Sequence, residues 1–281
     1  MTELTWTSTQ EKRLKELQIN LEDIPNSFAN ASARNKLFQQ LEKEQVTKLK
    51  EQLTAFLTQG RRVALEELTE KLTVALCRQG FTRVTTPTVI SRSSLAKMTV
   101  DENHPLSRQV YWINENQCLR PMLAPNLYSL MADFARLRHR PIRYFEIGSC
   151  FRKESDGAKH NSEFTMLNLV EMGTPEDEKT PRLKELASLV AKTAGLTDFK
   201  LVSEESKVYG TTVDVVTGPE EIEVASGAMG PHPLDIAWGI TDTWVGIGFG
   251  LERLLMTAAG ESSIGRFGKN LSCINGVRLN L

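Results

Sequence analysis

Apolar residues recur at helical spacing through the first sixty residues. Ser8 with Glu11 three residues later is typical of a capping box, and Leu14 and Leu17 continue an apolar stripe. A second helix, ending near Gly60, is predicted by six apolar side chains on one face: Leu37, Leu41, Leu49, Leu53, Phe56 and Leu57. We therefore expect residues 1–61 to form a helical extension.

From residue 62 onward, helical and alternating patterns follow one another. An amphipathic helix is predicted from Val63 to Gln79, and a strand from Phe81 to Thr86 follows it and ends before Pro87. The order helix, strand, proline is therefore the first element of this region.

Further helices and strands complete the pattern. A helix is expected to open at Pro125, because proline favours the first turn, and another runs from Thr180 as N-cap to Gly195. Strands are predicted at residues 144–153, 164–172, 211–216, 221–229 and 244–250. Residues 62–281 are thus expected to be one α+β domain with a mainly antiparallel sheet.

Composition narrows the class of protein. The 281 residues are 40% hydrophobic and 25% charged, which suits one sizeable core with a small appendage. No apolar run approaches the roughly 20 residues that cross a bilayer, and no secretory pattern begins the chain, so a cytoplasmic protein is expected. The net charge of −1 neither predicts nor excludes a polyanionic partner. Four cysteines without metal-ligand spacing are expected to be reduced and mostly buried: Cys77, Cys118, Cys150 and Cys273.

The hairpin that joins the strands at 144–153 and 164–172 carries groups suited to a nucleotide. It contains the run Phe151-Arg152-Lys153-Glu154 and returns through His160 to Phe164. An arginine offers a planar fork to phosphate oxygens, a carboxylate accepts from an adenine amino group, and a phenyl face stacks on a base. Taken alone, an Arg-x-Glu on a strand is more often a surface ion pair, and that alternative stays open.

A glycine-rich strand supplies the second candidate element. In Gly246-Ile247-Gly248-Phe249-Gly250-Leu251-Glu252-Arg253, glycines at alternate positions leave one strand face without side chains. Such a face weakens a strand unless something approaches it closely. A flat ligand is therefore expected there, with Arg253 near a triphosphate.

The Pro87 element, the Phe-Arg-Lys-Glu run and the Gly-x-Gly-x-Gly-Leu-Glu-Arg run, in this order, resemble the three signature motifs of class II aminoacyl-tRNA synthetases. The resemblance covers about residues 62–281. It implies a core sheet of six or seven mainly antiparallel strands flanked by helices, a homodimer through the Pro87 element, and ATP with Mg²⁺ as cofactors.

The same resemblance implies roles for individual residues. Arg152 would clamp the α-phosphate and the substrate carboxylate, and Arg253 would lie across the nucleotide, so both are candidate catalytic residues. The remaining candidate ATP-binding residues are Glu154 and Phe164 for adenine, His160 for the γ-phosphate, and the floor glycines Gly248 and Gly250.

By resemblance, Glu223 and Ser226 are the candidate Mg²⁺ ligands, and hard oxygen ligands suit that ion. A spacing of three would place them on opposite faces of a regular strand. We therefore expect a β-bulge near Ala225 or Gly227. An exposed glutamate and a strand-edge serine without a metal is the alternative.

Two longer runs, Leu119 to Tyr128 and Glu163 to Leu169, resemble the pyrrolysyl-tRNA synthetase family nearly word for word. Alternation places Asn168 among apolar neighbours on one strand face, where a buried amide needs a partner. By resemblance, that partner is the side-chain carbonyl of pyrrolysine, a lysine acylated by a bulky ring. The pocket around it would be formed by Leu123, Ala124, Leu127, Tyr128, Met131, Val170 and Trp244, with Tyr209 on a closing loop.

The resemblance also implies partners. The substrate RNA would be tRNA(Pyl), and the chain resembles a short, bacterial-type catalytic subunit without the N-terminal tRNA-binding domain, which a separate protein could supply. Residues 1–61 and four arginines are candidate phosphate contacts: Arg136, Arg138, Arg140 and Arg143. Two alternatives stay open: a class II synthetase for another large or aromatic amino acid, and a non-catalytic tRNA-binding paralogue.

Overall fold

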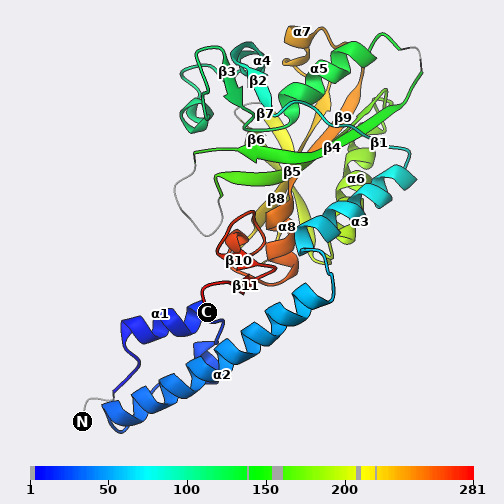
Figure 1. Ribbon diagram of the computed structural model, residues 1–281. Coiled ribbons are helices and arrows are strands. Elements are labelled where there is room, and N and C mark those ends of the chain that lie inside the picture. The colour runs from blue at the N-terminus through cyan, green and yellow to red at the C-terminus, as the bar shows by residue number, and fades with distance from the viewer. Residues whose placement is uncertain (1–3, 138, 154–160, 207–209, 219) are drawn as a thin grey trace. The chain divides into compact units, whose positions relative to one another are not determined.

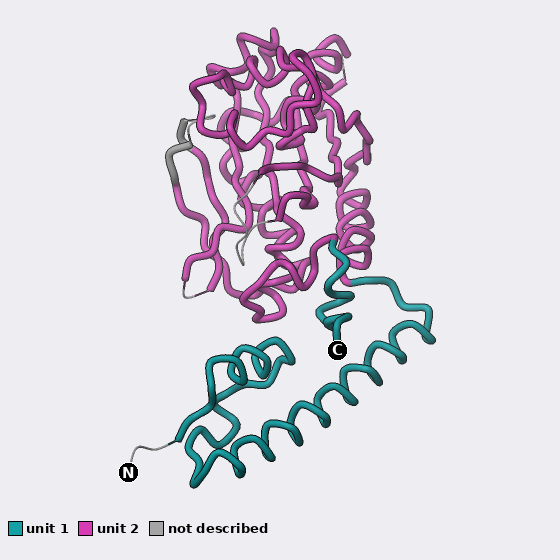
Figure 2. Tube along the Cα trace, turned by 60° about the vertical axis from the view of Figure 1, so that its left-hand side comes forward, with its two compact units in different colours: residues 1–63, 270–281 teal, residues 64–269 magenta. Residues whose placement is uncertain are grey.

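The computed structural model describes residues 4–137, 139–153, 161–206, 210–218 and 220–281. The chain divides into two compact units, residues 1–63 with 270–281 and residues 64–269 (Figure 2). The sequence placed the boundary after residue 61 and assigned residues 270–281 to the sheet domain, whereas these last residues group with the N-terminal unit. Within the described residues, no helix combines the length and the apolar character that crossing a membrane requires.

The first unit is helical, as expected. It contains α1 (Ser8–Glu16), the 3-10 turn η1 (Leu21–Asp23) and α2 (Ala31–Thr58), together with a short hairpin of β10 (Cys273–Ile274) and β11 (Val277–Arg278). An ion pair of 2.7 Å joins Arg13 on α1 to Glu42 on α2, and Arg278 lies 3.2 Å from Glu16. These contacts hold the C-terminal hairpin and the two helices in one unit.

The capping box of α1 lies one residue earlier than predicted. Thr7 Oγ1 accepts from the backbone of Gln10 at 3.2 Å, and Gln10 Oε1 accepts from the backbone of Thr7 at 3.2 Å. The prediction of Ser8 with Glu11 was therefore wrong. Both pairs satisfy the same spacing rule, so the pattern alone does not choose between them.

The second unit is built on a seven-stranded sheet in its described residues (Figure 1). Strand β1 lies parallel to β4, and every other neighbouring pair is antiparallel. This confirms the predicted α+β class with a mainly antiparallel sheet. The strand order is β1 (Thr82–Arg83), β4 (Ile142–Phe151), β5 (Glu163–Met172), β9 (Trp244–Gly250), β8 (Ile222–Gly230), β7 (Gly210–Thr217) and β6 (Phe199–Ser206).

Two hydrophobic clusters cover the two faces of the sheet. Helices α3 (Ala64–Arg78), α6 (Lys179–Thr193) and α8 (Leu251–Ala258) pack on one face against buried side chains such as Phe145, Ile247 and Phe249. The opposite face contacts α5 (Ala124–Phe134) and the segments around it, which are α4 (Arg92–Lys97), η2 (Pro105–Gln109), α7 (Asp235–Trp238) and the hairpin of β2 (Val89–Ser91) and β3 (Gln117–Leu119). Successive strand residues alternate between the two clusters, as the pleat requires.

Several predicted boundaries need correction. Helix α6 begins at Lys179 with Glu178 as N-cap, so Thr180 lies inside the helix. The strand predicted over residues 81–86 is only Thr82–Arg83, because the chain turns into the polar network described below. The edge strand β6 was not predicted. All four cysteines are free, as expected, but only Cys118 and Cys150 are buried.

Candidate active site

A cavity of about 320 Å³ lies on the α5 face of the sheet, over strands β5, β9 and β8. Helix α5, the residue that follows β4, and the first turn of α8 complete its wall. One continuous hollow therefore joins the region of the Phe-Arg-Lys-Glu run to the region of the apolar α5 side chains. Fourteen of the predicted site residues line it: Arg152, Phe164, Glu223, Ser226, Gly248, Gly250, Arg253, Ala124, Leu127, Tyr128, Met131, Asn168, Val170 and Trp244.

The glycines of β9 form the floor of this cavity. Gly246 and Gly248 are paired with Val170 and Asn168 of β5, and all four line the hollow. A Cβ atom placed on Gly248 would lie 2.9 Å from Oδ1 and 3.0 Å from Nδ2 of Asn168. Glycine at 248 is therefore what leaves room for the Asn168 side chain on its neighbouring strand.

Asn168 is the polar group at the centre of the β5 face. Its Oδ1 is buried and has no hydrogen-bond partner among the described residues. Buried amide oxygens in folded proteins are normally satisfied. The cavity thus presents a carboxamide, half-buried among apolar walls, whose Oδ1 is open to a hydrogen-bond donor from a ligand.

Two arginines lie along the cavity at its polar end. Arg152 directly follows β4, and its Nε donates to the carbonyl of Pro121 at 3.0 Å. The Arg152 guanidinium carbon lies 5.2 Å from the centre of the Phe164 ring. Arg253, in the first turn of α8, donates from Nη1 to the backbone oxygen of Glu223 at 3.2 Å. The surface ion-pair alternative for Arg152 is not tested, because Glu154 lies outside the described residues.

Strand β8 contains the β-bulge that the sequence called for. Val216 pairs with Glu223 while Val215 pairs with Ala225, so Val224 is the extra residue. Ser226 pairs with Asp214, two residues before Val216 on β7, which places Glu223 and Ser226 on the same face. Both residues line the cavity. Val224 and Ala225 are buried in the core cluster of the opposite face and also contribute to the cavity lining. The extra residue, Val224, is adjacent to Ala225, near which the bulge was predicted.

Glu252 ties the first turn of α8 to strand β5. Its carboxylate is buried and accepts from the backbone of Thr165 at 2.8 and 3.0 Å through its two oxygens. Burial raises the pKa of Glu252, and the hydrogen bonds from the backbone oppose this shift. The next residue is Arg253, so this contact fixes where the Arg253 side chain leaves the helix. The sequence assigned no role to Glu252.

The apolar end of the cavity is formed by one face of α5. Ala124, Leu127, Tyr128 and Met131 follow helical spacing and line the hollow. The Tyr128 ring meets the Trp244 ring edge to face, with centroids 5.7 Å apart. Leu123 was predicted for this wall but does not line it, because its side chain is fully buried in the core cluster.

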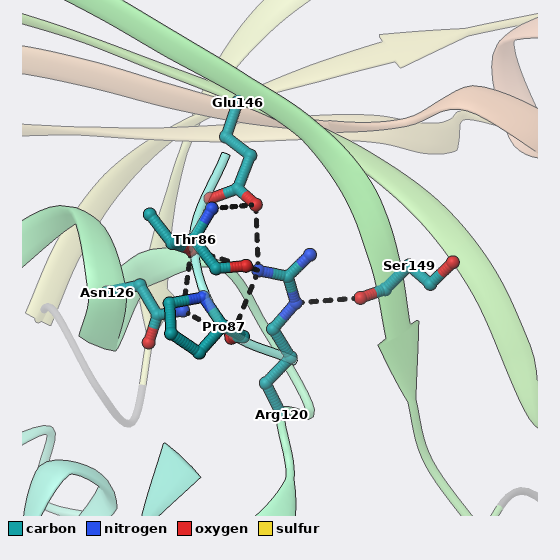
Figure 3. Close-up of polar contacts among 6 residues, drawn as sticks. All are labelled: Thr86, Pro87, Arg120, Asn126, Glu146 and Ser149. Carbon is teal, nitrogen blue, oxygen red and sulfur yellow. Dashed lines mark hydrogen bonds and ion pairs between the residues drawn. The ribbon is translucent and has the colours of Figure 1, made fainter. Parts of the chain in front are cut away.

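A buried polar network supports both ends of the site (Figure 3). Arg120 donates from Nη1 to Glu146 at 2.8 Å and to Thr86 Oγ1 at 3.0 Å, and both charged side chains are almost fully buried. Asn126, in the first turn of α5, donates to Thr86 Oγ1 at 2.6 Å and to the Pro87 oxygen at 2.8 Å. The network therefore joins the Pro87 element, strand β4 and the start of α5.

Comparisons with known proteins agree with this geometry. A family model for the core domain of class II tRNA synthetases (F) matches residues 48–276. A crystal structure of pyrrolysyl-tRNA synthetase from Desulfitobacterium hafniense is 51% identical, covers 100% of both chains and superposes with a TM-score of 0.90. The chain belongs to the pyrrolysyl-tRNA synthetase family. A second structure of a pyrrolysyl-tRNA synthetase from the same organism is 50% identical and has a TM-score of 0.87, covering 99% of this chain and 96% of that one.

Membership of the pyrrolysyl-tRNA synthetase family confirms the resemblance seen in the sequence, but three predicted site residues cannot be placed. Glu154, His160 and Tyr209 lie outside the described residues. Their expected contacts with adenine, with the γ-phosphate and with the amino acid stay predictions.

Several lining residues were not named as site residues from the sequence. Met166 and Ala228 lie two positions from predicted ones on the same strand faces, and Gly246 continues the alternate glycines. Alternation along a strand was a sufficient signal for all three. Met122, Leu106 and Ile264 also line the cavity. They come from loops and short turns, where periodicity gives no signal.

The basic cluster predicted to contact phosphates is largely paired within the chain. Arg140 donates to both oxygens of Asp242, at 3.1 and 2.8 Å, and Arg143 lies 2.6 Å from Glu171. Burial alone would raise the pKa of Glu171, but hydrogen bonds from Arg182 and Arg143 outweigh it and lower the pKa below its usual value. Arg136 is exposed and lies 3.9 Å from Asp133, and Arg138 lies outside the described residues.

Proposed function

We propose that this chain activates pyrrolysine, or a similar lysine acylated on its side chain, with ATP and transfers it to the 3′ end of tRNA(Pyl). The observation that carries the proposal is one cavity with a guanidinium at one end and, among apolar walls at the other, a carboxamide whose oxygen has no partner among the described residues. ATP and an aminoacyl chain placed end to end fit such an arrangement. Membership of the pyrrolysyl-tRNA synthetase family supports it independently.

Formation of the aminoacyl-adenylate is assigned to the end of the cavity that holds the two arginines. The carboxylate oxygen of the amino acid attacks the α-phosphorus of ATP, and the bond to the bridging oxygen breaks, so that pyrophosphate leaves with the electron pair. Negative charge grows on the phosphate oxygens during this step. Arg152 would stabilise that charge through its planar fork, and Arg253, which lines the same cavity as the floor glycines, would contact the leaving phosphates.

Glu223 and Ser226 fit the role of Mg²⁺ ligands. The bulge at Val224 turns both oxygen-bearing side chains into the cavity, near Arg253. Mg²⁺ is commonly held by one or two protein oxygens together with substrate phosphates. When bound there, the ion would neutralise phosphate charge and orient the leaving group.

Recognition at the other end depends on one polar contact. Asn168 donates to the carbonyl of the acylated side chain, while the aliphatic and aromatic walls accept its ring. A free lysine would bring an ammonium group into the same apolar walls, where an unpaired charge is strongly disfavoured. Acylation removes that charge and supplies an amide, whose carbonyl can accept from Asn168 Nδ2 and whose N–H can donate to the Oδ1 that has no partner among the described residues.

The proposed partners extend beyond the cavity. We include a homodimer through the Pro87 element, near which Val89 leaves 42% of its surface exposed. For tRNA(Pyl), residues 1–61 remain candidate contacts. Arg140 and Arg143 are weaker candidates than the sequence suggested, since each already has a carboxylate partner.

Exchange of labelled pyrophosphate into ATP tests the proposal with the full chain. We expect exchange that depends on a lysine carrying a bulky ring as its side-chain acyl group. Phenylalanine and unmodified lysine, which lack the acyl carbonyl, are the matched controls and should give exchange near background. Exchange driven by phenylalanine but not by acyl-lysine would show that the cavity serves another amino acid.

A further inference from the structure

We propose that Asp235 is a positioning residue that fixes the indole of Trp244 and thereby sets the end of the amino-acid pocket. The inference rests on the proposed function, since it concerns which acyl groups that pocket accepts. Asp235 does not line the cavity. It acts on substrate choice only through Trp244, which does.

The contact between the two side chains is direct and buried. Trp244 Nε1 donates to Asp235 Oδ2 at 2.9 Å, and the backbone of His232 donates to the same oxygen at 2.7 Å. Trp244 is 3% exposed and Asp235 is 2% exposed. A tryptophan N–H that lost this acceptor would be left buried without a partner, so the indole is expected to move when the acceptor is removed.

Two glycines shape a slot in which the indole lies. Gly230 pairs with Trp244 across strands β8 and β9, and a Cβ on Gly230 would fall 1.8 Å from the indole Nε1. On the other side, a Cβ on Gly246 would lie 3.2 Å from Cζ3 of the same ring. The indole therefore crosses a stretch of sheet without side chains to reach Asp235, and this rotamer is available because both positions are glycine.

The cavity wall that Trp244 forms depends on the indole being held in this orientation by Asp235. The Trp244 ring system also contacts Tyr128, which lines the apolar end of the cavity on α5. Asp235 begins α7, whose last residue, Trp238, lies 5.6 Å from the Tyr128 ring. Releasing the indole would change the shape offered to a bulky acyl group, whereas a short acyl group would not reach it.

One oxygen of Asp235 carries the whole interaction. Oδ2 receives both donors, while Oδ1 is buried and has no hydrogen-bond partner in the described parts of the chain. Asparagine can place its single side-chain oxygen at the Oδ2 position and accept both donors. The Asp235→Asn chain should therefore keep the hydrogen bond that orients the Trp244 indole, and the Asp235→Ala chain should lose it.

Two readouts test this in the wild-type, Asp235→Ala and Asp235→Asn chains. The first is kcat/KM for pyrophosphate exchange with a bulky ring-acylated lysine and with acetyl-lysine. We expect Asp235→Ala to lose about tenfold with the bulky substrate, as a lost hydrogen bond of about 1.4 kcal/mol implies, and less than about twofold with acetyl-lysine. Asp235→Asn should stay near wild type with both.

The second readout needs no activity. The indole N–H of Trp244, assigned in ¹⁵N spectra by comparison with Trp244→Phe, should exchange slowly with solvent in wild type and Asp235→Asn, and fast in Asp235→Ala. If Asp235→Ala does not fold, Gly230→Ala is the second variant: its Cβ would overlap the indole Nε1, displace the ring from Asp235 and give the same loss of protection.

The outcomes separate this inference from the proposed function. Equal losses with both substrates, or an indole that stays protected in Asp235→Ala, would overturn the positioning role. Failure of wild type to use either acyl-lysine would overturn the proposed function, and the indole exchange would still decide whether Asp235 holds Trp244.

Discussion

Replacing Arg152 by alanine is expected to lower the rate of pyrophosphate exchange about 100- to 1,000-fold, because a preorganised donor to the reacting phosphate is lost from the site. Its guanidinium is held by the Pro121 carbonyl and lies near the Phe164 ring, so it is already oriented before substrate binds. The loss should appear mainly in kcat, since charge develops on the phosphate in the transition state.

Two variants serve as controls for the Arg152→Ala chain. Arg152→Lys keeps the charge but not the planar fork, and should recover only part of the rate. Arg136→Ala removes an exposed arginine outside the cavity and should leave exchange unchanged. Thermal unfolding of Arg152→Ala should stay close to wild type. An Arg152→Ala chain that keeps most of its exchange activity would exclude a role for this guanidinium in the chemistry.

Replacing Arg120 by methionine is expected to destabilise the protein by about 3–5 kcal/mol, because it leaves the Glu146 carboxylate buried without its cationic partner. Glu146 is 1% exposed and would keep only its two hydrogen bonds from Thr86. The network also holds Pro87 and the first turn of α5, so the variant should raise KM for the amino acid. Denaturant unfolding measures the first effect and exchange kinetics the second.

A double variant separates the cost of an unpaired charge from the loss of the network. Arg120→Met combined with Glu146→Leu removes both charges and should recover part of the lost stability, since buried ion pairs are often replaceable by apolar side chains. The KM defect should remain, because Thr86 loses both Arg120 and Glu146 and keeps its contact with Asn126. A single Arg120→Met chain as stable as wild type would contradict the buried-pair account.

Much of the fold followed from periodicity. The alternation that placed Asn168 among apolar neighbours on one strand face is observed, since Phe164, Met166 and Val170 line the same cavity. The helical spacing of α5 also placed its lining residues correctly. These predictions worked because each element buries one face against its neighbours, so the period of apolar residues in the sequence matches the period of buried positions. The need for a bulge in β8 was also predicted correctly, since two polar residues three apart had to share a face.

What the sequence did not show depends on contacts between distant segments. Leu123 was placed in the pocket by its neighbours in the sequence, whereas its side chain is buried in the core. Arg140 and Arg143 looked like a free basic cluster because Asp242 and Glu171 lie far away in the chain. The hydrogen bond between Trp244 and Asp235 requires glycine at 230, because a Cβ there would overlap the indole. This requirement is visible only once β8 and β9 are paired.

Exchange kinetics of Asn168→Ala, measured with ring-acylated lysine and with phenylalanine, test the central claim most directly. If the lone carboxamide binds the acyl carbonyl, kcat/KM for acyl-lysine should fall roughly 10- to 100-fold, as loss of one buried hydrogen bond implies. Phenylalanine has no side-chain carbonyl and so makes no such contact with Asn168, and the exchange that it supports should stay the same or rise. Unchanged kinetics with acyl-lysine would contradict the account.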